Sequence, residues 1–287
     1  MAKIAELLKA GRSYSFEFFP PRNEEAEATL TRTLAELEKL KPTFVSMTYG
    51  AGGSTRDKTY ELVVDLLRNS TMTPMAHLTC AGSSEAELRE LVGRYRDDGV
   101  ENILALRGDP PAEMGLPPGD LAHAGQLVEL VREVGPFSIG VAAHPEGHPL
   151  CPDRQLDRDR QAAKLDRADF GVTQFFFNLD DYKTFLDDLD ARGVRKPIIP
   201  GIMPVTNVSQ IERFAQLSGA DFPAWLAERL HAVADDPAEV RRIGVEVATE
   251  LSQGLLDAGA PGLHFYTLNR PQPTTEIWTN LGLPHAP

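Results

Sequence analysis

Cysteine is scarce in this chain of 287 residues, which contains only Cys80 and Cys151. Two thiols that far apart build no disulfide framework and lack the spacing of metal ligands. Basic charge is in deficit as well, because 29 lysines and arginines face 42 aspartates and glutamates, for a net charge of −13. A nucleic-acid-binding protein usually carries a basic patch or excess, and this sequence shows neither. We therefore expect no nucleic-acid partner.

Long apolar runs are also missing. The first residues, MAKIAELLKAG (1–11), contain no apolar stretch long enough for the core of a signal peptide or for a membrane span. Together with the low cysteine content, this absence predicts a protein of the reducing cytoplasm that does not partner with a membrane. The chain is 42% hydrophobic and 25% charged, which is typical of a globular protein with an ample core.

What the chain does contain is a repeated order of strand, turn and helix. The eight candidate strands are YSFEFF (14–19), TFVSMTY (43–49), PMAHLT (74–79), NILALRG (102–108), FSIGVAA (137–143), VTQFFF (172–177), PIIPGIM (197–203) and GLHFYTL (262–268). The amphipathic helical patterns lie near residues 24–40, 56–69, 84–97, 120–134, 155–168, 180–192, 207–217, 223–258 and 274–281.

Eight such units in a chain of this length predict an α/β fold, a (β/α)₈ TIM barrel. We expect a single catalytic domain over residues 1–287, with extra helices between the seventh and eighth strands. The main rival is a doubly wound sheet, but no G-x-G-x-x-G follows the first strand, so a Rossmann dinucleotide site has no support. The Pro- and Gly-rich stretch 108–120 follows the fourth strand and is predicted to be a loop on the side where barrels keep their active sites.

Polar side chains stand at the ends of most predicted strands. They include Glu17, Thr48, His77, Arg107, Asp109, His144, His148, Gln174, Tyr266 and Arg270. The carboxyl ends of parallel barrel strands meet at one mouth, so these side chains are predicted to line one pocket. Each has a structural alternative when taken alone, such as an ion pair for Glu17 or a satisfied core histidine at position 77. Their joint occurrence favours a functional site.

A metal-dependent hydrolase is one alternative class. His77, His144 and His148 have the chemistry of zinc ligands. However, barrel hydrolases of this kind typically carry H-x-H on one strand, which is absent here, and we expect no metal.

Eight motifs, in this order, resemble those of bacterial methylenetetrahydrofolate reductases over about residues 13–283. They are FEFFPPR (16–22), FVSMTYGAGGSTR (44–56), HLTC (77–80), ALRGDPP (105–111), HPEGHP (144–149), TQFFFN (173–178), PGIMPV (200–205) and HFYTLNR (264–270). The resemblance implies a (β/α)₈ barrel that binds FAD non-covalently and uses NADH or NADPH to reduce 5,10-methylenetetrahydrofolate to 5-methyltetrahydrofolate for methionine synthesis. It also implies a homo-oligomer, a dimer or tetramer. A folate-binding or methyl-transfer barrel without redox activity is the other function left open.

The resemblance also implies roles for particular residues. Glu17 matches the family's catalytic acid, and burial between Phe16 and Phe18 is expected to raise its pKa so that it holds a proton for N10 of the folate. Asp109 matches a catalytic aspartate beside flavin and pterin. The FAD-binding positions are Thr48, His77, Arg107, Gly108, Asp109, His144, His148, Asp157, Arg160 and Lys164, and the substrate positions are Glu17, Gln174, Gln210, Phe214, Tyr266 and Arg270. Two departures are His144, where many members have tyrosine, and Arg160, where the family has asparagine.

Overall fold

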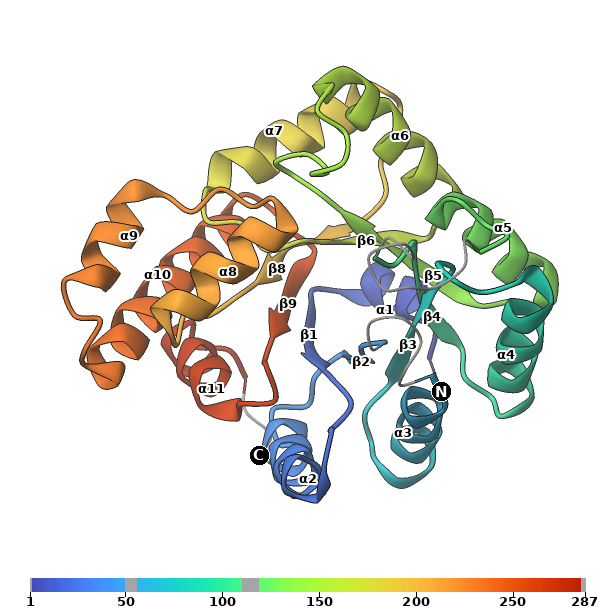
Figure 1. Cartoon of the computed structure of the whole chain (residues 1–287), viewed down its shortest axis with the longest axis horizontal. Coiled ribbons are helices and arrows are strands. Elements are labelled where there is room, and N and C mark those ends of the chain that lie inside the picture. Colours follow the sequence, from blue (N-terminus) through green and yellow to red (C-terminus); the bar gives the residue numbers. More distant parts are fainter. Residues whose placement is uncertain (1, 50–55, 110–118, 285–287) are drawn as a thin grey trace.

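The computed structural model describes residues 2–49, 56–109 and 119–284. Within these ranges nine parallel strands curl into a nearly closed barrel surrounded by helices (Figure 1). The strands are β1 (Ser13–Phe18), β2 (Phe44–Met47), β3 (Pro74–Thr79), β4 (Asn102–Leu106), β5 (Ser138–Ala143), β6 (Phe170–Thr173), β7 (Ile198–Ile199), β8 (Gly201–Ile202) and β9 (Gly262–Tyr266). The helices are α1 (Ile4–Ala10), α2 (Glu24–Glu38), α3 (Arg56–Asn69), α4 (Glu85–Asp97), α5 (Ala124–Val134), α6 (Arg154–Arg167), α7 (Leu179–Asp190), α8 (Val208–Ser218), α9 (Ala224–His231), α10 (Pro237–Asp257) and α11 (Pro271–Asn280).

The barrel closes through its seventh strand, which is interrupted at Pro200. The order of the sheet is β7-β6-β5-β4-β3-β2-β1-β9-β8, so β7 pairs with β6 and β8 pairs with β9. Proline has no N–H to donate to a strand ladder, which splits the predicted strand 197–203 into two short ones. The Pro200 carbonyl still accepts the His264 N–H at 2.9 Å. The eight predicted β/α units are therefore confirmed, with one strand in two pieces.

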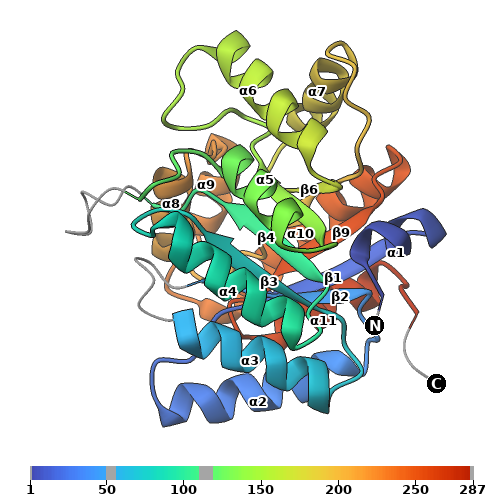
Figure 2. The same cartoon turned by 90° about the vertical axis from the view of Figure 1, so that its right-hand side faces the viewer.

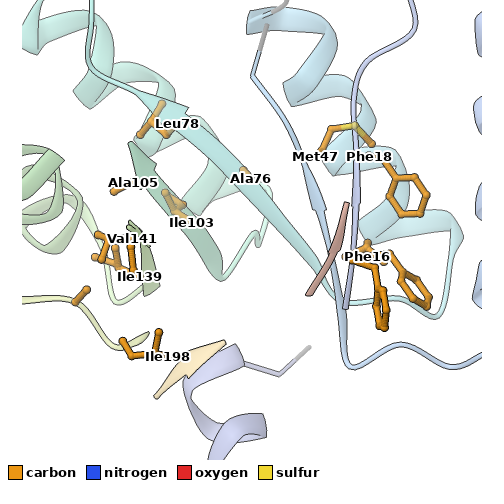
Figure 3. Close-up of a cluster of buried hydrophobic side chains, with 14 of the residues drawn as sticks. Phe16, Phe18, Met47, Ala76, Leu78, Ile103, Ala105, Ile139, Val141 and Ile198 are labelled. Atoms are coloured by element: carbon orange, nitrogen blue, oxygen red, sulfur yellow. The ribbon is translucent and has the colours of Figure 1, made fainter. Parts of the chain in front are cut away.

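Alternation along each strand separates an outer apolar face from the barrel interior. Phe16 and Phe18 of β1 and Ile103 and Ala105 of β4 belong to one buried cluster, which packs against the surrounding helices (Figure 3). Glu17 lies between the two phenylalanines in sequence, so its side chain leaves the opposite face of β1. The period of two thus sends the aromatic rings outward and the carboxylate inward.

The end of the barrel at which the strands begin is closed by α1, a helix that the sequence analysis did not predict. Ile4 is buried against a small cluster inside the barrel. Its N–H donates to Asn102 Oδ1 at 2.8 Å, and the N–H of Ala5 donates to Ser138 Oγ at 3.0 Å. Both acceptors stand at strand starts, and Figure 2 shows α1 at the end of the barrel away from α8. With seven residues and one buried side chain, α1 is too short to show a helical period.

Two further predictions need correction, and a third is confirmed. The sixth strand was predicted over 172–177, but β6 ends at Thr173 because Phe175–Phe177 are buried in two different clusters within a connecting segment. The long helical region 223–258 is two helices, and α10 starts where Asp236 caps it and Pro237 takes the first position. The extra helices predicted before the last strand are confirmed as α9 and α10. Among the described helices, none combines the length and apolarity needed to cross a bilayer.

Candidate functional site: a polar barrel mouth and an adjoining basic groove

Seven of the predicted site residues line one cavity at the carboxyl ends of the strands. The cavity has a volume of about 440 Å³. The predicted residues in its wall are Glu17, His77, Asp109, His144, Gln174, Phe214 and Tyr266. Six of them stand on strands or on the segments that follow strands in six different β/α units, and Phe214 stands on α8 of a seventh, so the strand ends converge on one mouth.

At the base of the mouth, Glu17 lies among three polar neighbours, two from the adjacent strands β2 and β9 and one from β3. Its Oε2 is 3.3 Å from His77 Nε2, 3.4 Å from His264 Nε2 and 3.4 Å from Ser46 Oγ. Only His264 and Ser46 meet it in hydrogen-bonding geometry, so the contact with His77 is a close electrostatic one. Parallel pairing explains the cluster, because β1 lies between β2 and β9 and Glu17 stands level with Ser46.

His264 is itself held in place from the other side of its ring. Its Nδ1 is 2.8 Å from Ser15 Oγ, and the ring stacks on Phe44 at 5.8 Å between centroids. The imidazole is fully buried. Sequence reasoning missed both Ser15 and His264 as site residues. The signal was the alternation of polar residues along each strand, Ser15 with Glu17 and His264 with Tyr266, which places each pair on the interior face.

The expectation of a raised pKa for Glu17 is wrong in this structure. Burial does raise the pKa, but His77 and His264 lower it by more, to about 2. Phe16 and Phe18 were expected to desolvate the carboxyl, yet their rings lie on the opposite side of β1. Imidazole groups, rather than aromatic ones, face the carboxylate, and they favour its charged form.

We therefore expect the Glu17 carboxylate to stay ionised in the free protein from about pH 5 to pH 9. Because its folded-state pKa lies below the reference value of 4.5, the imidazole contacts stabilise the fold above that pH, and this contribution is lost as the pH falls toward 2. A ¹³C NMR titration of glutamate-labelled protein, with Glu17→Gln to assign the signal, checks this. A Glu17 signal that titrates between about pH 5 and pH 8 would contradict it.

Tyr266 contributes a fixed phenol to the mouth. Its hydroxyl donates to the Thr173 carbonyl at 2.6 Å, and its ring meets His264 edge-on at 5.4 Å. Burial, with a smaller contribution from the Glu17 charge, raises the pKa of Tyr266 well above 10.0. Its proton is therefore committed to a backbone acceptor, and the ring serves as a wall of the cavity.

A second cavity of about 330 Å³ adjoins the mouth and carries basic side chains. Its walls hold the predicted cofactor residues Arg107, His144, His148, Asp157, Arg160 and Lys164. The two cavities share the walls Leu106, Ala142 and His144, so the groove leads into the mouth. Among the described residues, no group of three His, Cys, Asp or Glu side chains is placed to hold a metal ion. The zinc-hydrolase alternative therefore finds no set of ligands among them.

The cationic side chains of this groove are not all paired with carboxylates of the described residues. Within the part of the chain that the structure describes, Lys164 makes no hydrogen bond or ion pair, and burial lowers its pKa to about 8 while Asp157 partly offsets the shift. Asp157 is already engaged, since its Oδ2 accepts from Gln161 Nε2 at 2.6 Å and lies 3.3 Å from Arg158. Burial and the nearby Lys164 also lower the pKa of His144 well below 6.5. The groove therefore suits an anionic group such as a pyrophosphate.

The groove also includes the amino-terminal end of α5, which sequence reasoning missed. His123, Ala124 and Gly125 line the cavity where this helix begins. A helix start presents free N–H groups and a partial positive charge, which adds to the attraction for an anion. No motif marks this segment, so only the folded chain brings it beside Lys164.

Four predicted residues line neither cavity. Thr48 uses its N–H to donate to the Phe18 carbonyl at 2.8 Å, and Gly108 lies beyond Arg107 in a left-handed conformation with φ of 86°. Gln210 lies in the first turn of α8, and Arg270 is exposed at the start of α11. Their assigned contacts stay predictions. The glycines at positions 50, 52 and 53 and most of the loop 108–120 lie outside the described residues.

A parallel (β/α)₈ barrel with a carboxylate–imidazole cluster in its mouth and a basic groove beside it defines an enzyme of the barrel class. The chain matches the profile of the family described as methylenetetrahydrofolate reductase over residues 2–282. The 5,10-methylenetetrahydrofolate reductase of Pectobacterium carotovorum is 39% identical over 98% of this chain and 93% of its own. That of Escherichia coli K12 is 38% identical over 94% of this chain and 90% of its own. The chain therefore belongs to the methylenetetrahydrofolate reductase family and is an oxidoreductase that acts on a folate.

Two other comparisons bear on architecture. Methylenetetrahydrofolate reductase (NADH) 1 of Arabidopsis thaliana is 35% identical over 98% of this chain, which spans 50% of that longer protein. A solved structure, an uncharacterized protein from Clostridium thermocellum that binds two copies of 5-methyl-5,6,7,8-tetrahydrofolic acid, aligns with a TM-score of 0.67 over 98% of this chain and 96% of its own. At 17% identity this likeness shows the fold alone.

Proposed function

We propose that this protein reduces 5,10-methylenetetrahydrofolate to 5-methyltetrahydrofolate with non-covalent FAD and with NADH or NADPH as the electron donor. The product supplies the methyl group for methionine synthesis in the cytoplasm. We further propose that the whole chain is one catalytic domain and that it works as a homo-oligomer, a dimer or tetramer. The observation that carries the proposal is the shared wall of Leu106, Ala142 and His144 between a basic groove and a mouth with a carboxylate–imidazole cluster.

The groove has the donor set that a dinucleotide requires. Arg107, His148 and Lys164 would hold the phosphates, together with the N–H groups at the start of α5. His144, at the junction, would stand beside the part of the cofactor that reaches the mouth. Arg160 lines the groove as well, so where the family has asparagine this chain has a cation that would face the phosphates of the cofactor. FAD bound there supplies a hydride carrier that two substrates can meet in turn.

In the mouth, the chain's own residues handle the proton. Opening the methylene bridge of the folate requires a proton at N10. In the free protein Glu17 is ionised, so it must take up a proton before its Oε2, which lies within 3.4 Å of Nε2 of both His77 and His264, can deliver one to N10. A folate that displaces water from the mouth raises the pKa of Glu17 and favours this transfer.

The other residues of the mouth bind and orient the folate. Gln174 uses Oε1 to accept the N–H of Phe175 at 3.0 Å, which leaves its amide N–H₂ for the pterin edge. Phe214 on α8 supplies an aromatic face for the pterin or the nicotinamide. Gln210 and Arg270 are assigned to the outer part of the folate, beyond the cavity wall.

Asp109 is proposed to make the flavin harder to reduce and a stronger hydride donor, because it places a carboxylate in the wall of the mouth. We expect Asp109→Asn to shift the flavin reduction potential to a less negative value and to slow the folate half-reaction. Redox titration with a reference dye measures the shift. An unchanged potential would refute the electrostatic role of Asp109.

The absorbance spectrum of the purified protein tests the proposed function against its rival. The proposal expects a flavin absorbance band that NADH or NADPH bleaches under anaerobic conditions. It also expects steady-state formation of 5-methyltetrahydrofolate. A colourless protein that binds 5-methyltetrahydrofolate without any flavin would favour the non-redox folate-binding barrel.

A further inference from the structure

The loop 144–149 between β5 and α6 touches the far end of α8 at two points. Glu146 Oε1 accepts the backbone N–H of Asp221 at 3.0 Å, across 75 residues of sequence. Nearby, Gly219 ends α8 so close to Pro149 that an added Cβ would lie 2.9 Å from the Pro149 Cβ. Two segments that are distant in sequence are thus joined side by side.

Each of these segments carries side chains of a cavity described above. The loop contributes His144 and His148 to the basic groove. The last two turns of α8 contribute Phe214 and Leu217 to the mouth. Glu146 lines neither cavity, but it stands between the segment that serves the groove and the segment that serves the mouth.

The loop is the fixed side of this junction. Arg158, only 1% exposed, donates to the carbonyls of His144 and Pro145 and is neutralised by Asp157 and Asp188. Gln161 adds a pair of hydrogen bonds to the backbone of His144, at 2.7 and 3.0 Å.

The end of α8 is packed on one side, where Ala220 and Phe222 lie against a buried cluster, and is exposed on the other. It terminates at Gly219 in a left-handed conformation, φ 73°, and its Leu217 is 68% exposed. The backbone N–H of Asp221, three residues beyond the helix, is the group that Glu146 binds. A hydrogen bond from a rigid loop to a partly exposed helix end helps to position the helix.

We propose that Glu146 is a positioning residue: by holding the Asp221 N–H, it fixes the carboxyl end of α8 over the mouth and thereby increases the affinity of the mouth for the folate. This inference rests on the proposed function, which assigns the folate to the mouth. It adds a residue that touches neither substrate nor cofactor and that acts through Phe214 and Leu217.

The charges around Glu146 make this contact sensitive to pH. Burial raises the pKa of Glu146 to about 7, and Asp181 of α7 and Asp221 raise it too, whereas the Asp221 N–H opposes the shift. Arg154 and Arg158 of α6 partly offset the raised pKa of Asp181. A carboxylate accepts a hydrogen bond more strongly than a neutral carboxyl group does, so the contact tightens as the pH rises through 7.

The test compares Glu146→Ala and Glu146→Gln with the wild-type flavin-loaded protein. Loss of a hydrogen bond to a charged group corresponds to about a 10-fold change in an equilibrium constant. We expect Glu146→Ala to raise the dissociation constant for 5-methyltetrahydrofolate about 10-fold at pH 8, with flavin content unchanged. We expect Glu146→Gln, whose amide oxygen still accepts, to stay within about 3-fold of the wild type. Asp187→Asn, which removes an exposed acid of α7, is the matched control and should change nothing.

Hydrogen exchange provides a second readout that does not depend on the folate. Backbone amides in 219–222 should exchange about 10-fold faster in Glu146→Ala. We also expect the ratio of the exchange rate in the wild type to that in Glu146→Gln to fall at these amides between pH 6 and pH 8. This comparison needs only the glutamine variant, so it stands even if the alanine variant folds poorly.

Three results would overturn the inference. They are unchanged folate affinity in Glu146→Ala, unchanged exchange at 219–222, and an equal loss of flavin and folate in both Glu146 variants, which would mark a purely structural role. Failure of the proposed function looks different, because the wild-type protein itself would then bind no folate while the exchange comparison still decides whether Glu146 fixes α8.

Discussion

Replacing Glu17 by glutamine is expected to slow the reduction of methylenetetrahydrofolate by about 10³-fold, because an amide cannot pass a proton to N10. Reduction of the flavin by the nicotinamide donor needs no such proton and should stay within about twofold of the wild-type rate. The difference between the two half-reactions is informative, because a general loss of structure would slow both of them. Anaerobic rapid mixing of each substrate with the purified protein measures the two rates separately.

The control for this variant is Glu24→Gln, which removes an exposed carboxylate from the first turn of α2. It should leave both half-reactions unchanged. If Glu17→Gln carries out both at normal rates, then the carboxylate among His77, His264 and Ser46 is a structural group, and the proton reaches the folate by another route.

Replacing Lys164 by methionine is expected to weaken FAD binding about 100-fold. The methionine side chain keeps most of the apolar volume but removes a cation that has no ion-pair partner among the described residues. A charge-assisted hydrogen bond to a phosphate, in a partly buried site, contributes on the order of 2–3 kcal/mol, which corresponds to that factor. Quenching of flavin fluorescence during titration of the flavin-free protein measures the dissociation constant.

Lys183→Met provides the matched control, because Lys183 is exposed on α7 and, among the described residues, pairs with Asp180 alone, at 3.3 Å. It should not alter flavin affinity. Equal affinity in Lys164→Met and the wild type would show that the basic groove does not hold the phosphates of the cofactor.

The barrel itself was readable from the sequence because its signals are local. Apolar runs bounded by glycine and proline predicted every strand, and the helical pattern 56–69 coincides with α3. The errors arose where local pattern and tertiary contacts disagree. Phe175–Phe177 look like strand residues, yet they leave the sheet because their rings bury in separate clusters. The helix α1 is fixed by Asn102 and Ser138, about 100 and 130 residues away, and no short-range signal encodes that contact.

The sequence predicted which residues line the candidate site, but it did not predict how they shift one another's pKa values. Strand ends and the family motifs brought Glu17, Gln174 and Tyr266 to the mouth. The shift of the Glu17 pKa was predicted in the wrong direction, because the sequence shows the neighbours of Glu17 along the chain and not its neighbours across the sheet. His264 lies 247 residues from Glu17 in sequence and 3.4 Å from it in space. The role proposed for Glu146 depends likewise on Asp221, to which no motif connects it.

The most direct test of the whole account is an anaerobic double-mixing experiment on the flavin-loaded protein. Mixing with NADH or NADPH should bleach the flavin, and a second mixing with 5,10-methylenetetrahydrofolate should restore its colour and yield one equivalent of 5-methyltetrahydrofolate. A flavin that stays reduced in the presence of the folate, or a protein that takes up no flavin at all, would contradict the claim that groove and mouth form one redox site.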